Sequence, residues 1–421
     1  MSMLLIKCLA IASCALPCLS YNASAQDSFP EISFEGLVDV RAVQGSGQSN
    51  WLDRGLGKTR YGTASDGSRS SIQFSEASLI ANVRFSWDLT AMAHIKFDPE
   101  QKNAVDLVEA YIKYDPVSTS PWRIHAKAGM FFPPISLEHS DVAWTSPYSL
   151  TPSAINTWVG EEIKATGLEV TFERRMEDLT LSLTGAAFML NDPTGTLLAW
   201  RGWALHDIKA TALGRFALPD INSIKSTGIF NKQAPWIEPH HEIDNRVGYY
   251  VAGNWEMKEA FTLSALYYNN RGNPIGFDGN QYSWGTNFFN LGLITLLPGD
   301  VELLAQYMKG NTIMGPRINE VYVLDMDFSS YYILLSKMIG EQRLSLRYDN
   351  FKTDDLSLIV EDNNNEAGHA WMASLSRSFD GGFRLMMEMQ YVDSDRASRL
   401  DFNIPTHAKE TQLQFSFRYS F

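Results

Sequence analysis

Apolar and polar residues alternate with a period of two along many short segments of this chain. The clearest segment is the last one, in which Leu413, Phe415, Phe417, Tyr419 and Phe421 alternate with polar residues. Such alternation predicts β-strands that have one apolar face and one polar face. The same pattern recurs in several earlier segments, at about 32–41, 77–86, 89–97, 108–114 and 122–130. The chain is therefore predicted to be all-β.

Short and long connections alternate between the predicted strands. About seven tight turns contain the Gly, Pro, Asp or Asn residues that turns favour, near 87–88, 115–116, 175–178, 256–259, 298–300, 340–341 and 380–382. About eight longer connections separate them, at 44–71, 98–105, 131–164, 190–246, 269–283, 310–329, 351–368 and 393–409. The count gives about 16 strands, or about 18 if 190–246 contains a further hairpin near 210–216.

This regular pattern predicts a closed barrel rather than a water-soluble sandwich. In a transmembrane antiparallel β-barrel, the apolar face of each strand meets lipid and the polar face meets the lumen. Long loops then lie outside the cell and short turns in the periplasm, and a lining of about 16 strands leaves an aqueous channel. The terminal Phe421 resembles the signal that such barrels present to their insertion machinery. These features indicate the bacterial outer membrane, with the lipid bilayer and lipopolysaccharide as partners.

The first residues are predicted to be a secretory signal peptide, 1–25. Lys7 supplies its only charge, the apolar stretch that follows is too short to cross a bilayer, and Ala23-Ser24-Ala25 is a small-x-small cleavage site. A lipoprotein signal ending at Cys14 is a competing interpretation. All 3 cysteines of the chain lie in this segment. The exported part, 26–421, is therefore predicted to be a single barrel domain without disulfides, a catalytic thiol or thiolate metal sites.

Composition agrees with a barrel and excludes other classes. Hydrophobic residues make up 45% of the chain and aromatic residues 12%, which suits strands that face lipid on one side and carry aromatic girdles at both interfaces. The formal net charge of −13 gives no basis for nucleic-acid binding. The Gly-x-Ser-x-Gly and His-Glu-x-x-His motifs do not occur, so neither an enzyme nor a cofactor is predicted.

One cluster of residues has the side chains of a metal site. His240 and His241 stand beside Glu238, Glu242 and Asp244. Adjacent histidines on an extended chain point to opposite faces, so they chelate one ion poorly. A polar external loop is therefore predicted here, and no metal site.

The long connection 131–164 differs from the others in its residues. It contains several prolines and several apolar anchors, among them Trp144, Tyr148, Ile155 and Trp158. A loop that folds against an inner wall needs such anchors, whereas a mobile surface loop needs few. The segment is therefore predicted to be the third external loop and to fold inward as the constriction of a pore. The alternative is an extracellular cap whose aromatic residues pack on neighbouring loops.

Part of the chain resembles a known family. The stretches Val105–Tyr114, Gly129–Pro134 and Pro147–Ala154 are similar to segments of the phosphate-selective porin O/P group and related Gram-negative porins. The barrel pattern extends the resemblance along most of the chain, but its local motifs are confined to about 105–165. The resemblance implies a 16-stranded porin, usually a homotrimer, whose third loop narrows the channel. It also implies a ladder of inward basic residues that passes anions, although strict phosphate selectivity is not implied because no dense arginine run is present.

Alternation places a group of basic side chains on the inner face of the second to fifth strands. They are Arg84, His94, Lys96, Lys113, Arg123, His125 and Lys127. Inward acids on these strands are Glu76 and Glu109. A basic wall concentrates anions inside a low-dielectric channel, but polar barrel interiors carry Lys and Arg as a matter of course. This group, the basic wall, is the candidate pore lining.

Four acids of the predicted constriction loop complete the candidate site: Glu138, Asp141, Glu161 and Glu162. If they face the basic wall, they produce the transverse field of a general porin, and they offset an anion preference. The predicted function is thus a porin, a passive diffusion channel for small hydrophilic solutes, with general and anion-favouring selectivity both open. The alternative is a non-conducting outer-membrane barrel with an adhesin or structural role.

Overall fold

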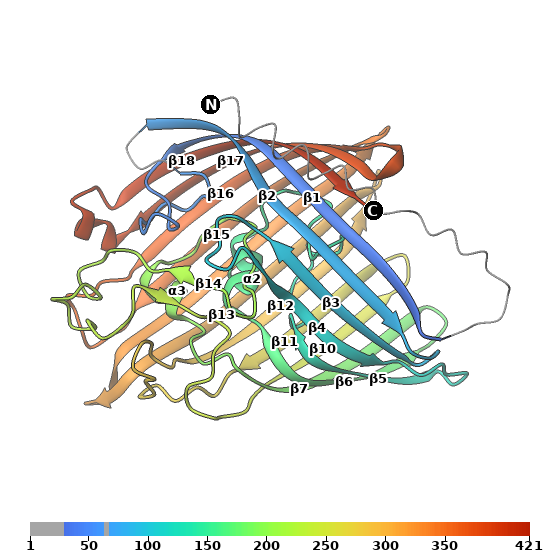
Figure 1. Ribbon diagram of the computed structural model, residues 1–421, viewed down its shortest axis with the longest axis horizontal. Coiled ribbons are helices and arrows are strands. Elements are labelled where there is room, and N and C mark those ends of the chain that lie inside the picture. Colours follow the sequence, from blue (N-terminus) through green and yellow to red (C-terminus); the bar gives the residue numbers. More distant parts are fainter. Residues whose placement is uncertain (1–28, 63–66) are drawn as a thin grey trace.

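The computed structural model of the protein describes residues 29–62 and 67–421. The predicted signal peptide, 1–25, lies outside the described residues. Sixteen antiparallel strands close into one barrel (Figure 1). Their bounds are β1 Glu31–Gly47, β2 Gly67–Arg84, β3 Leu89–Phe97, β4 Val105–Tyr114, β5 Trp122–Phe131, β6 Ala165–Arg175, β7 Leu179–Met189, β10 Gly248–Met257, β11 Phe261–Asn269, β12 Gly285–Leu297, β13 Val301–Ile318, β14 Val321–Ile339, β15 Gln342–Asp355, β16 Glu366–Ser378, β17 Phe383–Arg396 and β18 His407–Ser420.

The structure confirms 16 barrel strands, the lower of the two predicted numbers. The additional hairpin in the long connection after β7 consists of β8 (Phe216–Ala217) and β9 (Trp236–Ile237), which form a separate two-stranded sheet. These strands pair with each other and not with the barrel. The barrel closes instead through β1 and β18, where Val38 pairs with Tyr419.

The long connections lie at one end of the barrel, the loop end, and the short ones at the other, the turn end. One predicted long connection, 310–329, is wrong. Strands β13 and β14 continue through it and are joined by Asn319 and Glu320, whose φ angles are 48° and 70°. Positive φ at both positions matches the right-handed strand twist in a two-residue hairpin turn. Gly310, Asn311 and Gly315, which indicated a loop, lie inside β13.

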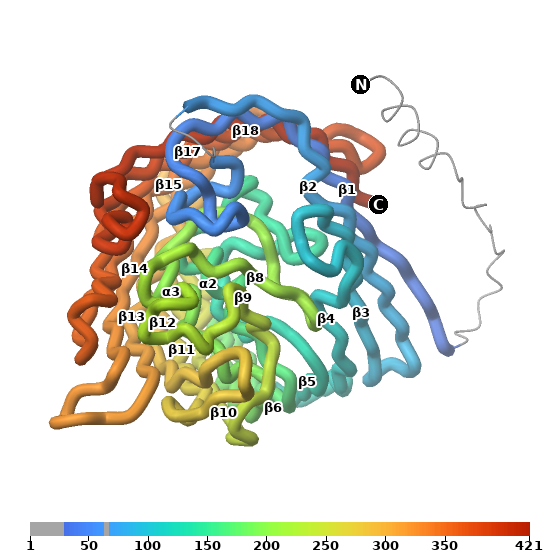
Figure 2. The backbone as a smooth tube through the Cα atoms, turned by 60° about the vertical axis from the view of Figure 1, so that its left-hand side comes forward, coloured from blue at the N-terminus to red at the C-terminus, as the bar shows by residue number. Residues whose placement is uncertain are grey.

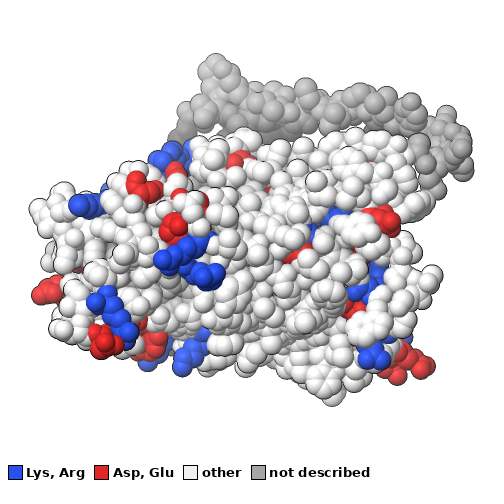
Figure 3. All heavy atoms as spheres, turned by 90° about the horizontal axis from the view of Figure 1, so that it is seen from below, with Lys and Arg blue, Asp and Glu red and all other residues white. Residues whose placement is uncertain are grey.

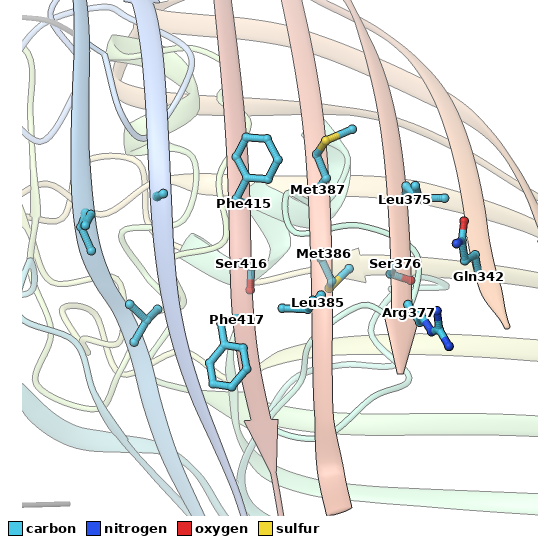
Figure 4. A pocket seen from close by; sticks show the side chains of 13 residues that line it. Gln342, Leu375, Ser376, Arg377, Leu385, Met386, Met387, Phe415, Ser416 and Phe417 are labelled. Carbon is cyan, nitrogen blue, oxygen red and sulfur yellow. The ribbon is translucent and has the colours of Figure 1, made fainter. Parts of the chain in front are cut away.

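The outer surface has the apolar belt of a membrane barrel. In β18, Phe415 and Phe417 are 49% and 50% exposed, whereas the intervening Ser416 is 3% exposed. Figure 4 shows these rings beside Met387 and Leu375 on the outside of β16–β18, around a shallow apolar depression. On the face in Figure 3, charged side chains gather toward the two ends and leave a largely uncharged band between them. The predicted orientation of the terminal strand, with aromatics toward lipid, is confirmed.

The barrel interior contains folded segments from the loop end. Helix α2 (Ala154–Glu162), helix α3 (Thr196–Trp200) and the β8–β9 hairpin all lie within the ring of strands when the barrel is viewed toward its loop end (Figure 2). Apolar side chains of the inner wall pack against these segments and form a hydrophobic core inside the barrel. Among the described residues, no helix is both long and apolar enough to span a membrane.

Candidate functional site

Residues 132–164, the inner loop, cross the lumen from β5 to the opposite wall. There the backbone N–H groups of Leu150 and Thr151 donate to Glu388 of β17, at 2.6 and 3.1 Å. Arg347 of β15 donates to the carbonyls of Thr151 and Pro152, at 2.8 and 2.9 Å. Helix α2 then returns the chain to β6. The predicted inward folding of this loop agrees with its position.

Helix α2 fixes the inner loop through apolar packing. The Ser153 hydroxyl caps the helix by accepting from the N–H of Asn156. Ile155 and Trp158 are fully buried, and the Trp158 ring lies 5.1 Å from that of Phe328 on β14, edge to face. Burial of one such side chain contributes about 1.5–3 kcal/mol, and edge-to-face aromatic contacts add to it. The inner loop is therefore anchored to the wall by a hydrophobic core.

A second segment, residues 203–213, also crosses the lumen, and we call it the strap. At one end the N–H of Trp203 donates to Glu366 of β16 at 3.1 Å. At the other end the N–H of Ala212 donates to the carbonyl of Leu107 on β4 at 2.8 Å. Between these ends, the N–H of Ala210 donates to the carbonyl of Gly160 in α2 at 2.7 Å. The strap thus runs between the inner loop and the wall formed by β1–β4.

Ion pairs hold the middle of the strap to that wall. Asp207 lies 2.6 Å from Arg41 of β1 and 2.8 Å from Arg60 of the β1–β2 connection. Lys209 lies 2.9 Å from Glu76 of β2. In the strap, burial raises the pKa of the Asp207 carboxyl, but the two arginines outweigh this effect and hold it well below its usual range. Asp207 is therefore ionised at every physiological pH.

The basic wall divides into two groups by exposure. His94 and Lys96 are buried beneath the strap, where Lys96 lies 3.1 Å from Asp98. Arg84 lies at the rim of the turn end, 3.2 Å from Glu31, with a side chain that is 51% exposed. The remaining members lie between these levels on the inner face and are partly exposed: Lys113, Arg123, His125 and Lys127. These four side chains and their acidic partners define the turn-end vestibule.

Acids partly neutralise the turn-end vestibule. Asp115 lies 2.8 Å from Lys113 and 3.4 Å from Arg123. Lys127 lies 3.1 Å from Glu169. Partly exposed pairs of this kind contribute little to stability, but they reduce the field that a mobile anion meets. The vestibule is therefore polar and water-accessible, with a smaller positive excess than a count of its basic residues indicates.

The acids of the inner loop do not face the basic wall, and that expectation is wrong. Glu138 is fully buried 3.0 Å from Arg347 on β15, on the opposite wall. Glu161 pairs with Arg201 and lies 2.7 Å from His206. Asp141 pairs with Arg384 of β17. Strand alternation does not determine which way a loop side chain points, and the basic partners come from strands far away in the sequence.

Glu162, the fourth loop acid, is buried at the start of α3. It accepts hydrogen bonds from the Trp158 indole at 2.6 Å and from the N–H of Leu197 at 2.9 Å. Burial raises the pKa of Glu162 to about 7, although these hydrogen bonds oppose the shift. For the neighbouring Glu161, burial also raises the pKa, but Arg201 and His206 outweigh it and lower the pKa to about 2. The pair therefore joins the inner loop to the segment that leads into the strap.

Several functional side chains could not be found from local sequence. Arg347, Glu366, Glu388 and Arg396 are fully buried, yet they hold the inner loop and the α3 region in place. Their only signal is that each stands at an inward position of its strand. That signal identifies a polar lumen-facing residue, but not the loop it binds.

A carboxylate cluster lies at the base of the 190–247 connection. Asp192, Glu242 and Asp244 bring oxygen atoms within 4.8 Å of one another. Asp192 accepts from the N–H groups of Ile243 and Asp244, at 2.5 and 3.0 Å, so the cluster organises the loop backbone. His241 turns away to Asp278, at 2.8 Å, and does not join it.

Comparison with known proteins bears on the fold. No family model and no curated protein matches this sequence. Among solved structures, the chain is similar to the outer membrane channel DcaP of Acinetobacter baumannii, with 10% identity, a TM-score of 0.54, and 95% of this chain and 99% of that chain covered. It is also similar to an anion-selective porin from Comamonas acidovorans, with 11% identity, a TM-score of 0.51, and 93% and 100% covered. At these identities the similarity shows the fold alone.

The fold and the apolar belt together define the class. The protein is a transmembrane β-barrel of the Gram-negative outer-membrane type, with a lumen that two of its own segments cross. A third structure of this class, OmpT of Vibrio cholerae, is similar over 94% of this chain and 99% of its own, with 9% identity and a TM-score of 0.51.

Proposed function

We propose that this protein is a porin, a passive diffusion channel for small hydrophilic solutes across the outer membrane. The observation that carries this proposal is the continuous charged inner face of β1–β6. Near the loop end it carries Arg41, at mid-height Glu76 and Lys96, and toward the turn end Lys127 and Arg123. A purely structural barrel has no need for charges at every level, because buried charges are costly unless they are paired.

Two segments set the bore in this proposal. The inner loop is the constriction, because it spans the lumen and is fixed to both walls. The strap narrows the remaining space beside β1–β4. We therefore expect a channel of low unit conductance, whose size depends on the position of the strap. The resemblance to the phosphate-selective porin O/P group supports a channel, and it does not extend here to phosphate selectivity.

Selectivity follows from the exposed part of the basic wall. Lys113, Arg123, His125 and Lys127 line the turn-end vestibule, while Asp115 and Glu169 offset part of their charge. We propose a small-solute channel with a weak preference for anions. The buried residues His94 and Lys96 contribute to this preference only when the strap moves.

We propose that the barrel assembles as a homotrimer through the outer face of β1–β5. Eight outward positions on these strands are alanine, interspersed among large apolar residues such as Phe74 and Ile112. They are Ala42, Ala77, Ala81, Ala91, Ala93, Ala110, Ala126 and Ala128. Consecutive strands on the other side carry an outward aromatic side chain at neighbouring positions of the strand ladder, namely Tyr249, Tyr267, Phe289, Tyr307, Tyr331, Tyr348, Trp371 and Tyr391. Such a girdle belongs at a lipid interface, and the alanines on β1–β5 leave gaps between the larger apolar side chains into which a second copy can pack.

Planar-bilayer recording of the purified protein tests the proposal. Discrete conductance steps, with a reversal potential in a salt gradient that indicates anions, support a porin with a basic wall. Steps that favour cations overturn the selectivity. No steps at all indicate a non-conducting barrel, and overturn the porin function.

A further inference from the structure

We propose that the strap occupies a solute site on the channel wall, and that this site takes small zwitterions whose carboxylate and amine are several bonds apart, such as dipeptides. In the closed arrangement Asp207 fills the carboxylate position and Lys209 the amine position. A solute that binds there displaces the middle of the strap, around Asp207 and Lys209, while Trp203 and Leu205 stay packed in the core inside the barrel. The inference rests on the proposed channel function and adds to it a solute class and a means of opening.

The carboxylate position is formed by Arg41 and Arg60. Each arginine contributes one nitrogen to a different oxygen of Asp207, at 2.6 and 2.8 Å. Both guanidinium groups are almost fully buried, and their other nitrogens donate to Asp39, Gln414 and Glu100. Pre-organised arginines are the groups that recognise carboxylates best. Asp207 thus binds as a small carboxylate would.

The ion pairs around Arg41 and Arg60 form a charge network that is neutral only when Asp207 is present. The network contains the four cations Arg41, Arg60, Lys96 and Arg418 and the four carboxylates Asp39, Asp98, Glu100 and Asp207. When the strap leaves, one positive charge in a buried environment loses its partner. An uncompensated buried charge is strongly unfavourable, so the vacated position favours an incoming anion.

The amine position is formed by Glu76. Lys209 lies 2.9 Å from this carboxylate and also donates to the carbonyl of Ala143 in the inner loop at 2.8 Å. The only other hydrogen-bond donor recorded for Glu76 among the described residues is Ser78, at 2.6 Å. Departure of the strap therefore leaves this carboxylate without its hydrogen-bonded ammonium, with Lys96 of β3 as the remaining cation nearby. The vacated wall then favours a cation at this point and an anion at Arg41 and Arg60.

The two positions are neighbours on the wall. Glu76 stands opposite Asp39 in the β1–β2 ladder, and Arg41 lies two residues farther along β1. On the strap, Asp207 and Lys209 are also two residues apart, about 6–7 Å along an extended chain. An α-amino acid holds its charges too close together for this spacing, whereas the termini of a dipeptide are separated by a comparable length of chain. This comparison selects the solute class.

The site can be reached from the loop end. A polar cavity of about 330 Å³ leads to Arg60, and it is lined by Asn50, Tyr61, Arg69, Gln73 and Glu100 among others. The Asp207 side chain itself is 15% exposed. A solute in this cavity can therefore approach Arg60 before the strap has moved, whereas Arg41 does not line the cavity.

Equilibrium titration of the full folded barrel in detergent tests the inference without requiring conduction. The probes are glycylglycine, acetate for the carboxylate alone and methylamine for the amine alone. In Asp207→Ala the internal competitor for the carboxylate position is gone while Lys209 remains, so glycylglycine should bind on the order of 10-fold more tightly than to the wild type. The affinity for acetate should also rise in this variant, but acetate should still bind more weakly than glycylglycine. Asp207→Asn provides a second, more conservative variant for the same measurement.

The matched control is Asp220→Ala. Asp220 lies on the same long connection and also pairs with an arginine, Arg54, but at the exposed surface. This variant should leave glycylglycine affinity unchanged. Equal affinity of wild type, Asp207→Ala and Asp207→Asn for glycylglycine would overturn the inference, and so would acetate binding as tightly as glycylglycine.

The two proposals fail separately. A barrel that conducts in bilayers but binds glycylglycine no better in Asp207→Ala retains the channel function and loses the zwitterion site. A barrel that shows the tighter binding but conducts under no condition retains the site and loses the channel.

Discussion

The two halves of the inner wall hold their partners by different forces. From β10 to β14 the inward side chains are mainly apolar and aromatic, and they pack against α2 and Trp203. From β1 to β6 they are mainly charged, and they pair with the strap and with one another. One half is thus an extension of a hydrophobic core, and the other is a polar surface.

This difference indicates which segment moves. Removing apolar surface from water stabilises the packed inner loop, and no solute in an aqueous lumen replaces that packing. A buried ion pair contributes little net free energy, because the cost of removing both charges from water offsets their attraction. Solute or water can replace such pairs. The middle of the strap, which Asp207 and Lys209 hold to the wall, is therefore the displaceable part, and its movement costs the apolar burial of Ile208. The inner loop, together with Trp203 and Leu205 at the start of the strap, is the fixed part.

Replacing the strap gives the largest expected effect. If residues 204–212 are replaced by a Gly-Ser linker of equal length, the ion pairs to β1 and β2 are lost and the lumen beside them opens. Unit conductance in planar bilayers should rise several-fold. The same replacement at 225–229, a mostly exposed part of the same connection, should leave conductance unchanged. Equal conductance of the two variants would contradict the proposal that the strap narrows the lumen.

The apolar half is tested by Trp158→Ala in α2. The substitution leaves a cavity in the core inside the barrel, and we expect a loss of about 3–5 kcal/mol in the free energy of unfolding. Urea unfolding of the barrel in detergent micelles measures this loss. Trp158→Phe keeps most of the packing and should recover most of the stability. A negligible effect of the alanine variant would mean that α2 is not anchored to the wall.

Charge selectivity should respond to the turn-end vestibule. Replacing Lys113, Arg123 and Lys127 together with glutamine should shift the reversal potential in a salt gradient toward cations, because Asp115 and Glu169 then lack partners. Arg174 and Arg377 point outward, so their glutamine variants are the control. If both sets of variants behave like the wild type, these side chains do not line the solute path.

The smallest expected effect concerns pH and the junction between the two segments. Burial raises the pKa of Glu162 from 4.5 to about 7, so the folded protein binds its proton more tightly than the unfolded chain does. This contribution is fully present below pH 4.5 and is lost as the pH rises through 7. Its size is about 3 kcal/mol.

The variant Glu162→Gln isolates this contribution. The free energy of unfolding of the wild type should fall more steeply between pH 5 and 8 than that of the variant, since other titrating groups are common to both. Glu238→Gln, at a partly exposed loop position, is the control. Identical slopes for wild type and Glu162→Gln would show that Glu162 is not buried in this environment.

The strands could be predicted from sequence because the alternation within each strand shows which of its side chains face outward. In β18 a period of two directs Phe415 and Phe417 toward lipid and Gln414 inward, and no other part of the chain is needed to see it. The two-residue turn at Asn319 and Glu320 was missed for the opposite reason. The turn consists of only two residues with positive φ, Asn319 and Glu320. Gly310 and Gly315 nearby instead indicate a longer loop in the sequence.

The candidate site could be predicted only in part. The prolines and aromatic residues of 131–164 indicated a folded inner loop, because such residues need a surface to pack against. The partners of Glu138 and Glu161 could not be predicted, since Arg347 and Arg201 reach them only after the barrel has closed. The strap was not foreseen at all. Segment 203–213 has no regular pattern, and its contacts come from distant parts of the chain, among them β1, β2, β4, the inner loop and β16.

Recording single channels from the purified wild-type barrel tests the central claim most directly. A porin with a narrow, strap-dependent bore should give discrete steps of low conductance, with a weak preference for anions in a salt gradient. The absence of any ion-conducting step, from protein that is shown to be folded and inserted, would contradict it.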